Sequence, residues 1–143
     1  MLVRNILEES VQKFGEVKAV KWLNKKEISE RSYCEIMENA ASVRKGLFAE
    51  GFEGKHIALI GASSVEWIES YLGIITGCTT AVPLDAALPC EDLADLINRS
   101  DCAALFLSPK HRPYLEVFLA NCPGLQKVWM LQEEVEGVPE KGY

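Results

Sequence analysis

The chain has 143 residues, of which 48% are hydrophobic, and its formal net charge is −6. This length suits one domain with a core of its own. The negative charge argues against a nucleic-acid partner, since a nucleic-acid groove needs clustered Lys and Arg, and the only dense basic run is Lys25-Lys26.

The cysteines and the apolar runs indicate the redox environment of the protein and whether it spans a membrane. The five cysteines are odd in number and include no C-x-x-C pair, which argues against a disulfide framework and against a zinc site. We therefore expect a reducing, cytoplasmic setting. The longest apolar run, residues 71–84, is broken by Gly73, Gly77 and Pro83, and it is too short for a membrane span.

The beginning of the chain has the pattern of a helix followed by a hairpin. Apolar side chains at helical spacing predict a helix over residues 5–14. Short strands are predicted near residues 18–23 and 27–30, and Asn24-Lys25 offers a tight turn between them.

A strong helix is predicted to begin at Ser32. The pattern Ser32-x-x-Glu35 is a capping box, in which the hydroxyl accepts from the Glu35 amide and the carboxylate reaches back. Gly51 lies just past the expected end, where a left-handed residue is favoured. One face of this helix is apolar: Ile36, Ala40, Val43 and Leu47.

The next segment reads as strand, turn and helix. Residues 56–61 are continuously apolar, which is typical of a strand buried on both faces of a parallel sheet. The turn Gly61-Ala62-Ser63-Ser64 leads into a helix over residues 64–76, for which Ser63-x-x-Glu66 has the form of a second capping box. The apolar face expected for this helix contains Trp67, Ile68, Tyr71, Leu72 and Ile75.

Strands and helices continue to alternate to the end of the sheet region. Strands are predicted over residues 79–84, 102–107 and 127–131, and helices over residues 89–98 and 113–121. The last helix has Pro at its first turn. Its inward side chains are expected to be Leu115, Phe118 and Leu119.

Alternating strands and helices indicate right-handed crossovers in a parallel sheet. The predicted fold class is therefore α/β: a mostly parallel, doubly wound sheet with helices on both faces, flavodoxin- or Rossmann-like, preceded by an N-terminal helix and a short β-hairpin. Residues 1–31 hold the helix and hairpin, and residues 32–131 form the α/β sheet subdomain. Residues 132–143 are acidic and without periodicity, and they read as a linker or a truncation tail.

Candidate reactive groups have simpler structural interpretations. The turn at Gly61 joins a strand to a helix N-terminus, where open α/β sheets can hold an anion, but it matches neither G-x-G-x-x-G nor a phosphate loop. A serine nucleophile at Ser63, with Asp85 or Asp92 and His111, is disfavoured because Val65 would crowd the strained elbow.

Metal ligation is disfavoured as well. Neither His56 nor His111 has a second ligand at metal spacing, so both are interpreted as structural or solvated. Composition and pattern assign no catalytic, cofactor-binding or metal-ligating residue to this chain. The ends of the strands near Ser63, Asp85 and Ser108 are expected to supply cleft walls at most.

Three stretches nevertheless resemble one family in order and spacing. Residues 32–36, Ser-Tyr-Cys-Glu-Ile, are similar to the [ST]-Y-x-E-[LI] motif of the adenylate-forming superfamily. Residues 60–67 are similar to its G-x-N-S-x-E-W segment, with Ser63 in place of Asn. Residues 75–85 resemble its L-x-A-G-x-x-x-V-P-L-D/N-P motif, with Ala86 in place of the final Pro.

The resemblance implies the N-terminal subdomain of an AMP-forming acyl-CoA synthetase or related ligase. Such an enzyme uses ATP to activate a carboxylic acid as an acyl-adenylate and then forms a thioester, as in fatty acid metabolism. The full-length protein would use ATP, Mg²⁺ and coenzyme A, or a carrier-protein thiol. The family's phosphate loop, its magnesium- and ribose-binding residues and its adenylating Lys would all follow Tyr143, so this fragment is expected to hold no cofactor and to be inactive alone.

The alternative is a standalone flavodoxin-like binding module without catalysis. A module should finish its sheet, whereas a fragment should leave an exposed edge or an apolar patch. Trp129 and Met130 are the residues predicted for such a patch.

Overall fold

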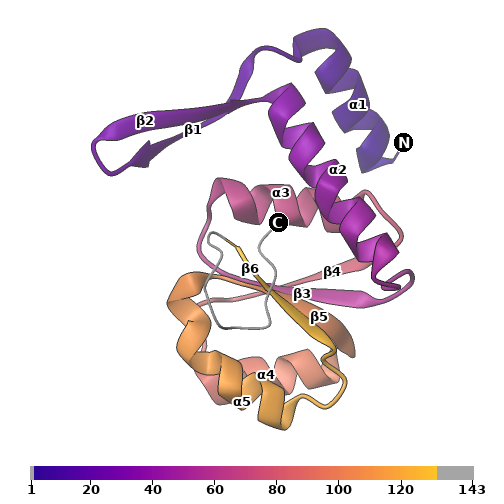
Figure 1. Cartoon of the computed structure of the whole chain (residues 1–143), viewed down its shortest axis with the longest axis vertical. Helices are drawn as coiled ribbons and strands as arrows, with labels where there is room; N and C mark the ends of the chain where they lie inside the picture. The colour runs from indigo at the N-terminus through magenta and orange to yellow at the C-terminus, as the bar shows by residue number, and fades with distance from the viewer. Residues whose placement is uncertain (1, 132–143) are drawn as a thin grey trace.

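The computed structural model describes residues 2–131. Two layers of helices enclose a four-stranded sheet, and an additional helix and a hairpin lie at one end of the molecule (Figure 1). None of the helices within these residues is long and apolar enough to cross a bilayer. The predicted tail, residues 132–143, lies outside the described part.

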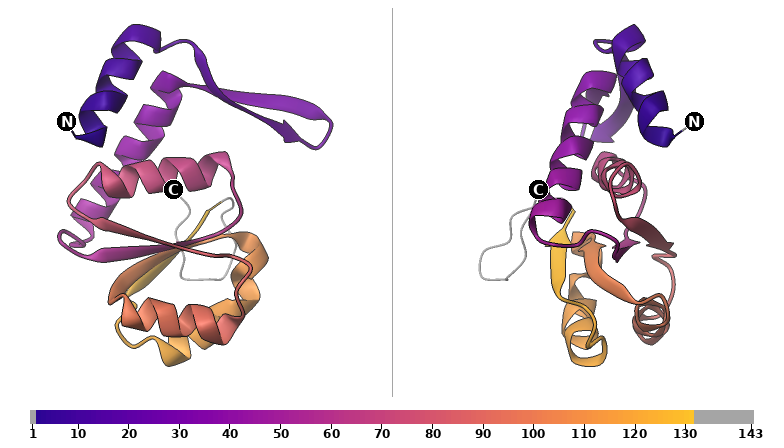
Figure 2. Two further views of the ribbon diagram at one scale, coloured as in Figure 1. Left: turned by 180° about the vertical axis from the view of Figure 1, so that it is seen from behind. Right: turned by 90° about the vertical axis from the view of Figure 1, so that its right-hand side faces the viewer.

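The N-terminal helix and hairpin form as predicted, with one shift in the turn. Asn24 pairs with Glu27, so the two turn residues are Lys25 and Lys26, and Lys25 takes the positive φ of 58° that the tight turn requires. The hairpin projects away from the sheet in Figures 1 and 2. The elements are α1 (Val3–Phe14), β1 (Lys18–Asn24) and β2 (Glu27–Ser32), with β1 and β2 antiparallel.

Helix α2 (Tyr33–Ala49) confirms the predicted cap and the predicted face. The Glu35 amide donates to Ser32 Oγ at 3.1 Å, and the Ser32 amide donates to Glu35 Oε2 at 2.7 Å. Gly51 follows the helix with a left-handed φ of 82°, which glycine adopts without strain. The buried residues of α2 are Ile36, Ala40, Val43 and Leu47.

The sheet is wholly parallel, in the order β4-β3-β5-β6. Figure 2 shows α2 and α3 on one face and α4 and α5 on the other, which confirms the predicted α/β architecture. Pro83 is tolerated because β4 is an edge strand. The strands are β3 (His56–Ile60), β4 (Thr80–Leu84), β5 (Cys102–Leu107) and β6 (Lys127–Met130), and the helices are α3 (Val65–Ile75), α4 (Cys90–Arg99) and α5 (Leu115–Asn121).

Each face of the sheet has its own core. From Ala104 onward, successive residues of β5 alternate between the two, so that Leu105 belongs to the core beneath α4 and α5, and Phe106 belongs to the core beneath α2 and α3. Trp129 and Met130 are 7% and 1% exposed, so the prediction of an apolar surface patch at these residues is wrong. Trp129 stacks on Phe106 with ring centroids 5.0 Å apart.

Two details of α3 differ from the prediction. Its N-cap is Ser64, whose hydroxyl accepts from the Trp67 amide at 3.1 Å, so the capping box expected at Ser63 does not form. Its expected apolar face is also wrong, because Trp67 and Tyr71 only flank the core. The residues that α3 buries are Val65, Glu69, Ser70, Gly73 and Ile74.

The last helix begins later than predicted. A 3₁₀ helix, η1 (Pro109–Tyr114), precedes α5 and contains Pro113 in its interior. Leu115 and Phe118 are buried as expected, whereas Leu119 is 54% exposed.

Candidate functional site

The carboxyl ends of the four strands lie level with one another at one edge of the sheet. Ile60 pairs with both Leu84 and Leu107, and Leu107 pairs with Met130. The residues that follow these strand ends are therefore level too: Gly61, Asp85, Ser108 and Leu131. The strand ends that the sequence singled out thus lie at this one edge.

This edge contains the point where the crossovers diverge. The chain leaves β3 toward α3 on one face, and it leaves the neighbouring strand β5 toward η1 and α5 on the other face (Figure 1). In open α/β sheets, ligands bind outside the carboxyl ends of the strands at such a switch point. The β3–β5 boundary is therefore the candidate functional site.

Gly61 keeps the switch point closely packed. A Cβ atom at this position would lie 3.0 Å from Ser108 Cβ and 3.1 Å from Leu131 Cδ1. The Ser108 amide donates to the Ile60 carbonyl at 2.9 Å, which extends the pairing of β3 and β5 by one residue. The φ of Gly61 is not in the left-handed region, so glycine serves the close approach of neighbouring atoms here and not a special backbone conformation.

A buried histidine joins two loops at this edge. His111 Nε2 donates to the Ala86 carbonyl at 2.8 Å, because a carbonyl can only accept. His111 Nδ1 is then the acceptor, and the Ser108 hydroxyl donates to it at 2.7 Å. His111 is 7% exposed and Ser108 is 9% exposed, so the chain of hydrogen bonds fixes the β4–α4 loop against the end of β5.

The arrangement excludes the hydrolase triad considered from the sequence. Both ring nitrogens of His111 are occupied by Ser108 and Ala86, and Asp85 Oδ1 accepts from the Ala87 amide at 2.9 Å within its own loop. Ser63 is exposed and precedes the helix cap. The structure therefore does not bring Ser63, Asp85 and His111 together.

The sequence interpretation missed the Ser108–His111 pair. The only available signal was their spacing of three residues directly after a buried strand. That signal is weak, because the partner that orients the ring is the Ala86 carbonyl, 25 positions away in the chain.

The remaining reactive groups are unsuited to catalysis. Burial raises the pKa of the Cys102 thiol to about 11, so it is protonated at neutral pH and a poor nucleophile. Among residues 2–131, no group of His, Cys, Asp and Glu side chains has the geometry to hold a metal ion. The carboxyl edge, as described, positions loops and offers a wall to a ligand.

Comparison with known proteins identifies the family. Residues 7–140 match the family described as AMP-binding enzyme. The chain belongs to the AMP-binding enzyme family. Membership agrees with the three motifs in residues 32–36, 60–67 and 75–85, which resemble those of the adenylate-forming superfamily.

Curated relatives of this AMP-binding chain are much longer than the chain itself. A CoA ligase from Gibberella moniliformis is 28% identical over 120 residues, which cover 73% of this chain and 20% of the relative. The nonribosomal peptide synthetase criC from Aspergillus cristatus is 32% identical over 78 residues, covering 54% of this chain and 4% of the relative. ATP synthase subunit delta from Flavobacterium johnsoniae is 34% identical over 79 residues, which cover 52% of this chain and 45% of the relative. This similarity covers a shorter part of the chain than the family match over residues 7–140.

Solved structures share the fold of this AMP-binding chain. Coronafacic acid ligase from Pectobacterium brasiliense has a TM-score of 0.87 at 19% identity, over 99% of this chain and 28% of the ligase. The anthranilate CoA ligase AuaEII, solved with anthranoyl-AMP, has a TM-score of 0.78 at 20% identity, over 88% of this chain and 24% of the ligase. The chain thus spans between a fifth and a third of the length of these three ligases.

Proposed function

We propose that this chain forms the first α/β part of an acid–thiol ligase that makes acyl-CoA thioesters. The observation that carries the proposal is the AMP-binding match over residues 7–140. The CoA ligase similarity supports coenzyme A as the acceptor, since it covers 73% of the chain, whereas the peptide synthetase similarity covers 54%. A carrier-protein thiol is the alternative acceptor.

The proposed reaction has two steps. A carboxylate oxygen of the substrate attacks the α-phosphorus of ATP, pyrophosphate leaves, and an acyl-adenylate forms. The thiol sulfur then attacks the acyl carbonyl, AMP leaves, and the thiol proton is released. Both steps build negative charge on oxygen, which needs positioned cations and hydrogen-bond donors for stabilisation.

The contribution of this chain is structural in that proposal. Gly61 and the His111 hydrogen bonds fix the carboxyl edge as one wall of a cleft. The described residues do not fit Mg²⁺, because no suitable ligand cluster exists among them, so the ion would be held by other parts of the ligase. We infer that residues 1–143 alone do not activate a carboxylic acid.

We place the ligase in the cytoplasm and in the metabolism of fatty or related acids. The cytoplasmic assignment rests on the thiols: all five cysteines are free, and Cys102 and Cys122 are buried as small apolar groups. The assignment to fatty or related acids extends the similarity to the CoA ligase, which does not itself specify the acid.

The proposal is tested by reading the source gene past the codon for Tyr143. We expect several hundred further codons that soon encode a loop rich in Ser, Thr and Gly followed by Lys. A stop codon directly after Tyr143 would contradict the ligase assignment and leave a binding module without catalysis.

A further inference from the structure

We propose that a pocket at the amino edge of the sheet binds an organic anion with an apolar body, such as a fatty carboxylate or an alkyl phosphate. The pocket has a volume of about 650 Å³, within the range of ligand sites in proteins. Its site lies at the end of the sheet opposite the carboxyl edge, because Thr79 precedes β4 and lines it. The proposal therefore does not rest on the proposed ligase function.

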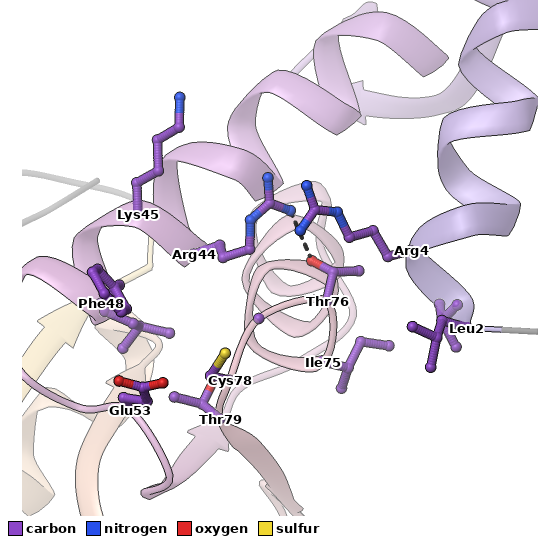
Figure 3. A pocket seen from close by; sticks show the side chains of 13 residues that line it. Leu2, Arg4, Arg44, Lys45, Phe48, Glu53, Ile75, Thr76, Cys78 and Thr79 are labelled. Carbon is purple, nitrogen blue, oxygen red and sulfur yellow. Dashed lines mark hydrogen bonds between the residues drawn. The ribbon is translucent and has the colours of Figure 1, made fainter.

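Three segments that are distant in the sequence enclose this pocket. The start of α1 supplies Leu2 and Arg4, the last turns of α2 supply Arg44 and Phe48, and residues 75–79 close the remaining side (Figure 3). This arrangement brings two guanidinium groups to one end of the pocket, and Figure 3 shows those of Arg4 and Arg44 beside each other.

The Arg44 guanidinium is held in place by a hydroxyl group, and Glu8 is the nearby carboxylate whose charge acts on it. Its Nη1 donates to Thr76 Oγ1 at 3.2 Å, and the Thr76 hydroxyl in turn donates to the Leu72 carbonyl at 2.6 Å. Among residues 2–131, no carboxylate forms an ion pair with Arg44. Burial lowers the pKa of Arg44, and the nearby charge of Arg4 lowers it further, against the opposing charge of Glu8.

Within residues 2–131, Arg4 has a single hydrogen-bond partner for its fork of donors, Glu8. Its Nε donates to Glu8 Oε1 at 2.9 Å, and Figure 3 shows the rest of the guanidinium turned toward Arg44. Two guanidinium groups with unused donors present a site that a carboxylate or phosphate head can bridge with two or more charged hydrogen bonds. An anion would also relieve the repulsion between the two arginines.

The other walls of the pocket favour an apolar body on that anion. Leu2 is 71% exposed and Phe48 is 64% exposed, although both line the pocket and neither belongs to a core. Ile75 adds a half-buried aliphatic side chain. Glu53 lies at the far side from Arg4 in Figure 3, so a second negative charge at that end is disfavoured and a single anionic head is favoured.

Cys78 gives a direct readout of occupancy, because it lines the pocket and its thiol is exposed. The full chain is alkylated with N-ethylmaleimide in the presence of decanoate, decyl phosphate, inorganic phosphate or decanol, and labelling at each cysteine is followed by mass spectrometry. Cys34 lies outside the pocket and serves as the internal reference. We expect decanoate or decyl phosphate to slow labelling of Cys78 and not of Cys34.

The probes separate the head groups. Protection by decanoate but not by decyl phosphate identifies a carboxylate site, and the reverse identifies a phosphate site. Equal protection by decanol would overturn the proposal, because the arginines would then be irrelevant. Absence of protection by both anionic probes below their micellar concentrations would overturn it as well.

Variants assign the binding to the pocket. Arg44→Gln should weaken decanoate binding by about tenfold, since it removes one charged donor pair. Arg99→Gln removes an equal charge from an exposed ion pair with Asp95 and should leave binding unchanged. If both variants bind as the parent does, the proposal is wrong.

A second variant covers the case in which Arg44→Gln disturbs folding. Phe48→Ser changes an exposed side chain and should leave the circular dichroism spectrum unchanged, while it weakens decanoate binding severalfold. Unchanged decanoate binding in folded Phe48→Ser would contradict the apolar part of the proposal.

Discussion

The two helical layers of this molecule hold the same sheet in different ways. The layer of α4 and α5 packs apolar side chains on the sheet, with Leu93, Ile97 and Phe118 at most 1% exposed. The layer of α2 and α3 brings helices together through small and polar groups, among them Gly73, Ser70 and Glu69. Both layers pack apolar side chains on the sheet, and the layer of α2 and α3 depends in addition on the close approach of its helix backbones.

Close approach is most severe at Gly73. A Cβ atom there would lie 2.6 Å from Val43 Cβ and 2.7 Å from the Ala40 carbonyl oxygen. The same interface buries Glu69, whose Oε1 accepts from Asn39 Nδ2 at 3.1 Å and pairs with Arg31 Nη1 at 3.1 Å. Arg31 belongs to β2, so this ion pair also connects the hairpin to the body.

The largest expected effect on stability tests the packing of the layer of α4 and α5 on the sheet. Phe118→Ala should lower the free energy of unfolding by about 3–5 kcal/mol, because it removes a fully buried ring and leaves a cavity. Leu119→Ala, one residue further on and 54% exposed, should change it by no more than about 0.5 kcal/mol. Urea denaturation measures both, and similar losses would mean that α5 is not packed as described.

A substitution at Gly73 tests the close packing of α3 against α2. Gly73→Ala should cost about 1–3 kcal/mol, because the added methyl group meets the backbone of α2. Gly46→Ala is the matched control, since it lies within α2 with no atom within 4 Å of its Cβ position, and it should stabilise the protein by about 0.5–1 kcal/mol. A shift of the same sign in both variants would refute the tight α2–α3 contact.

The N-terminus of α3 allows a finer test of the same layer. Ser64→Ala should lower the unfolding free energy by about 1 kcal/mol, since it removes the cap of the Trp67 amide. Ser63→Ala should have an effect within about 0.5 kcal/mol, because Ser63 is exposed outside the helix. Thermal unfolding of both variants decides between the two caps, and a larger loss for Ser63→Ala would restore the cap predicted from the sequence.

The smallest expected effect is a pH dependence of the unfolding free energy that arises from Glu69, in the layer of α2 and α3. Burial raises the pKa of Glu69, against the opposing effects of Asn39 and Arg31. In the folded state the Glu69 carboxyl therefore keeps its proton to a higher pH than in the unfolded state. The stability that the protonated carboxyl contributes is lost as the pH rises through the raised pKa of Glu69. The unfolding free energy of the parent relative to Glu69→Gln should fall as the pH rises above the ordinary pKa of a glutamate, whereas a rise would contradict the burial of this carboxyl.

The contrast between the layers also explains which parts of the fold were predictable. Apolar spacing predicts the buried face of α2, and continuous apolar runs predict β3 and β5, because burial of large side chains leaves a periodic signal. The buried face of α3 leaves no such signal, since it consists partly of Glu69, Ser70 and Gly73. The apolar rings of Trp67 and Tyr71 instead stack on each other at 5.3 Å at the rim.

The candidate site was predictable only in its position. Parallel alternation places the ends of β3, β4 and β5 at one edge, so the strand ends near Ser63, Asp85 and Ser108 were correctly expected there. The hydrogen bonds of His111 were not predictable, because its orienting carbonyl belongs to a different loop. The pocket at Arg44 joins segments that are distant in the sequence, and no local pattern indicates it.

We propose that this member of the AMP-binding enzyme family carries part of a ligase fold and activates a carboxylic acid only together with further residues. The most direct test is carboxylate-dependent ATP–pyrophosphate exchange, measured for residues 1–143 and for the product of the whole reading frame. The account predicts exchange by the whole product and none above the no-protein control for residues 1–143. Exchange by residues 1–143 alone, or none by the whole product with any carboxylic acid in a broad panel, would contradict it.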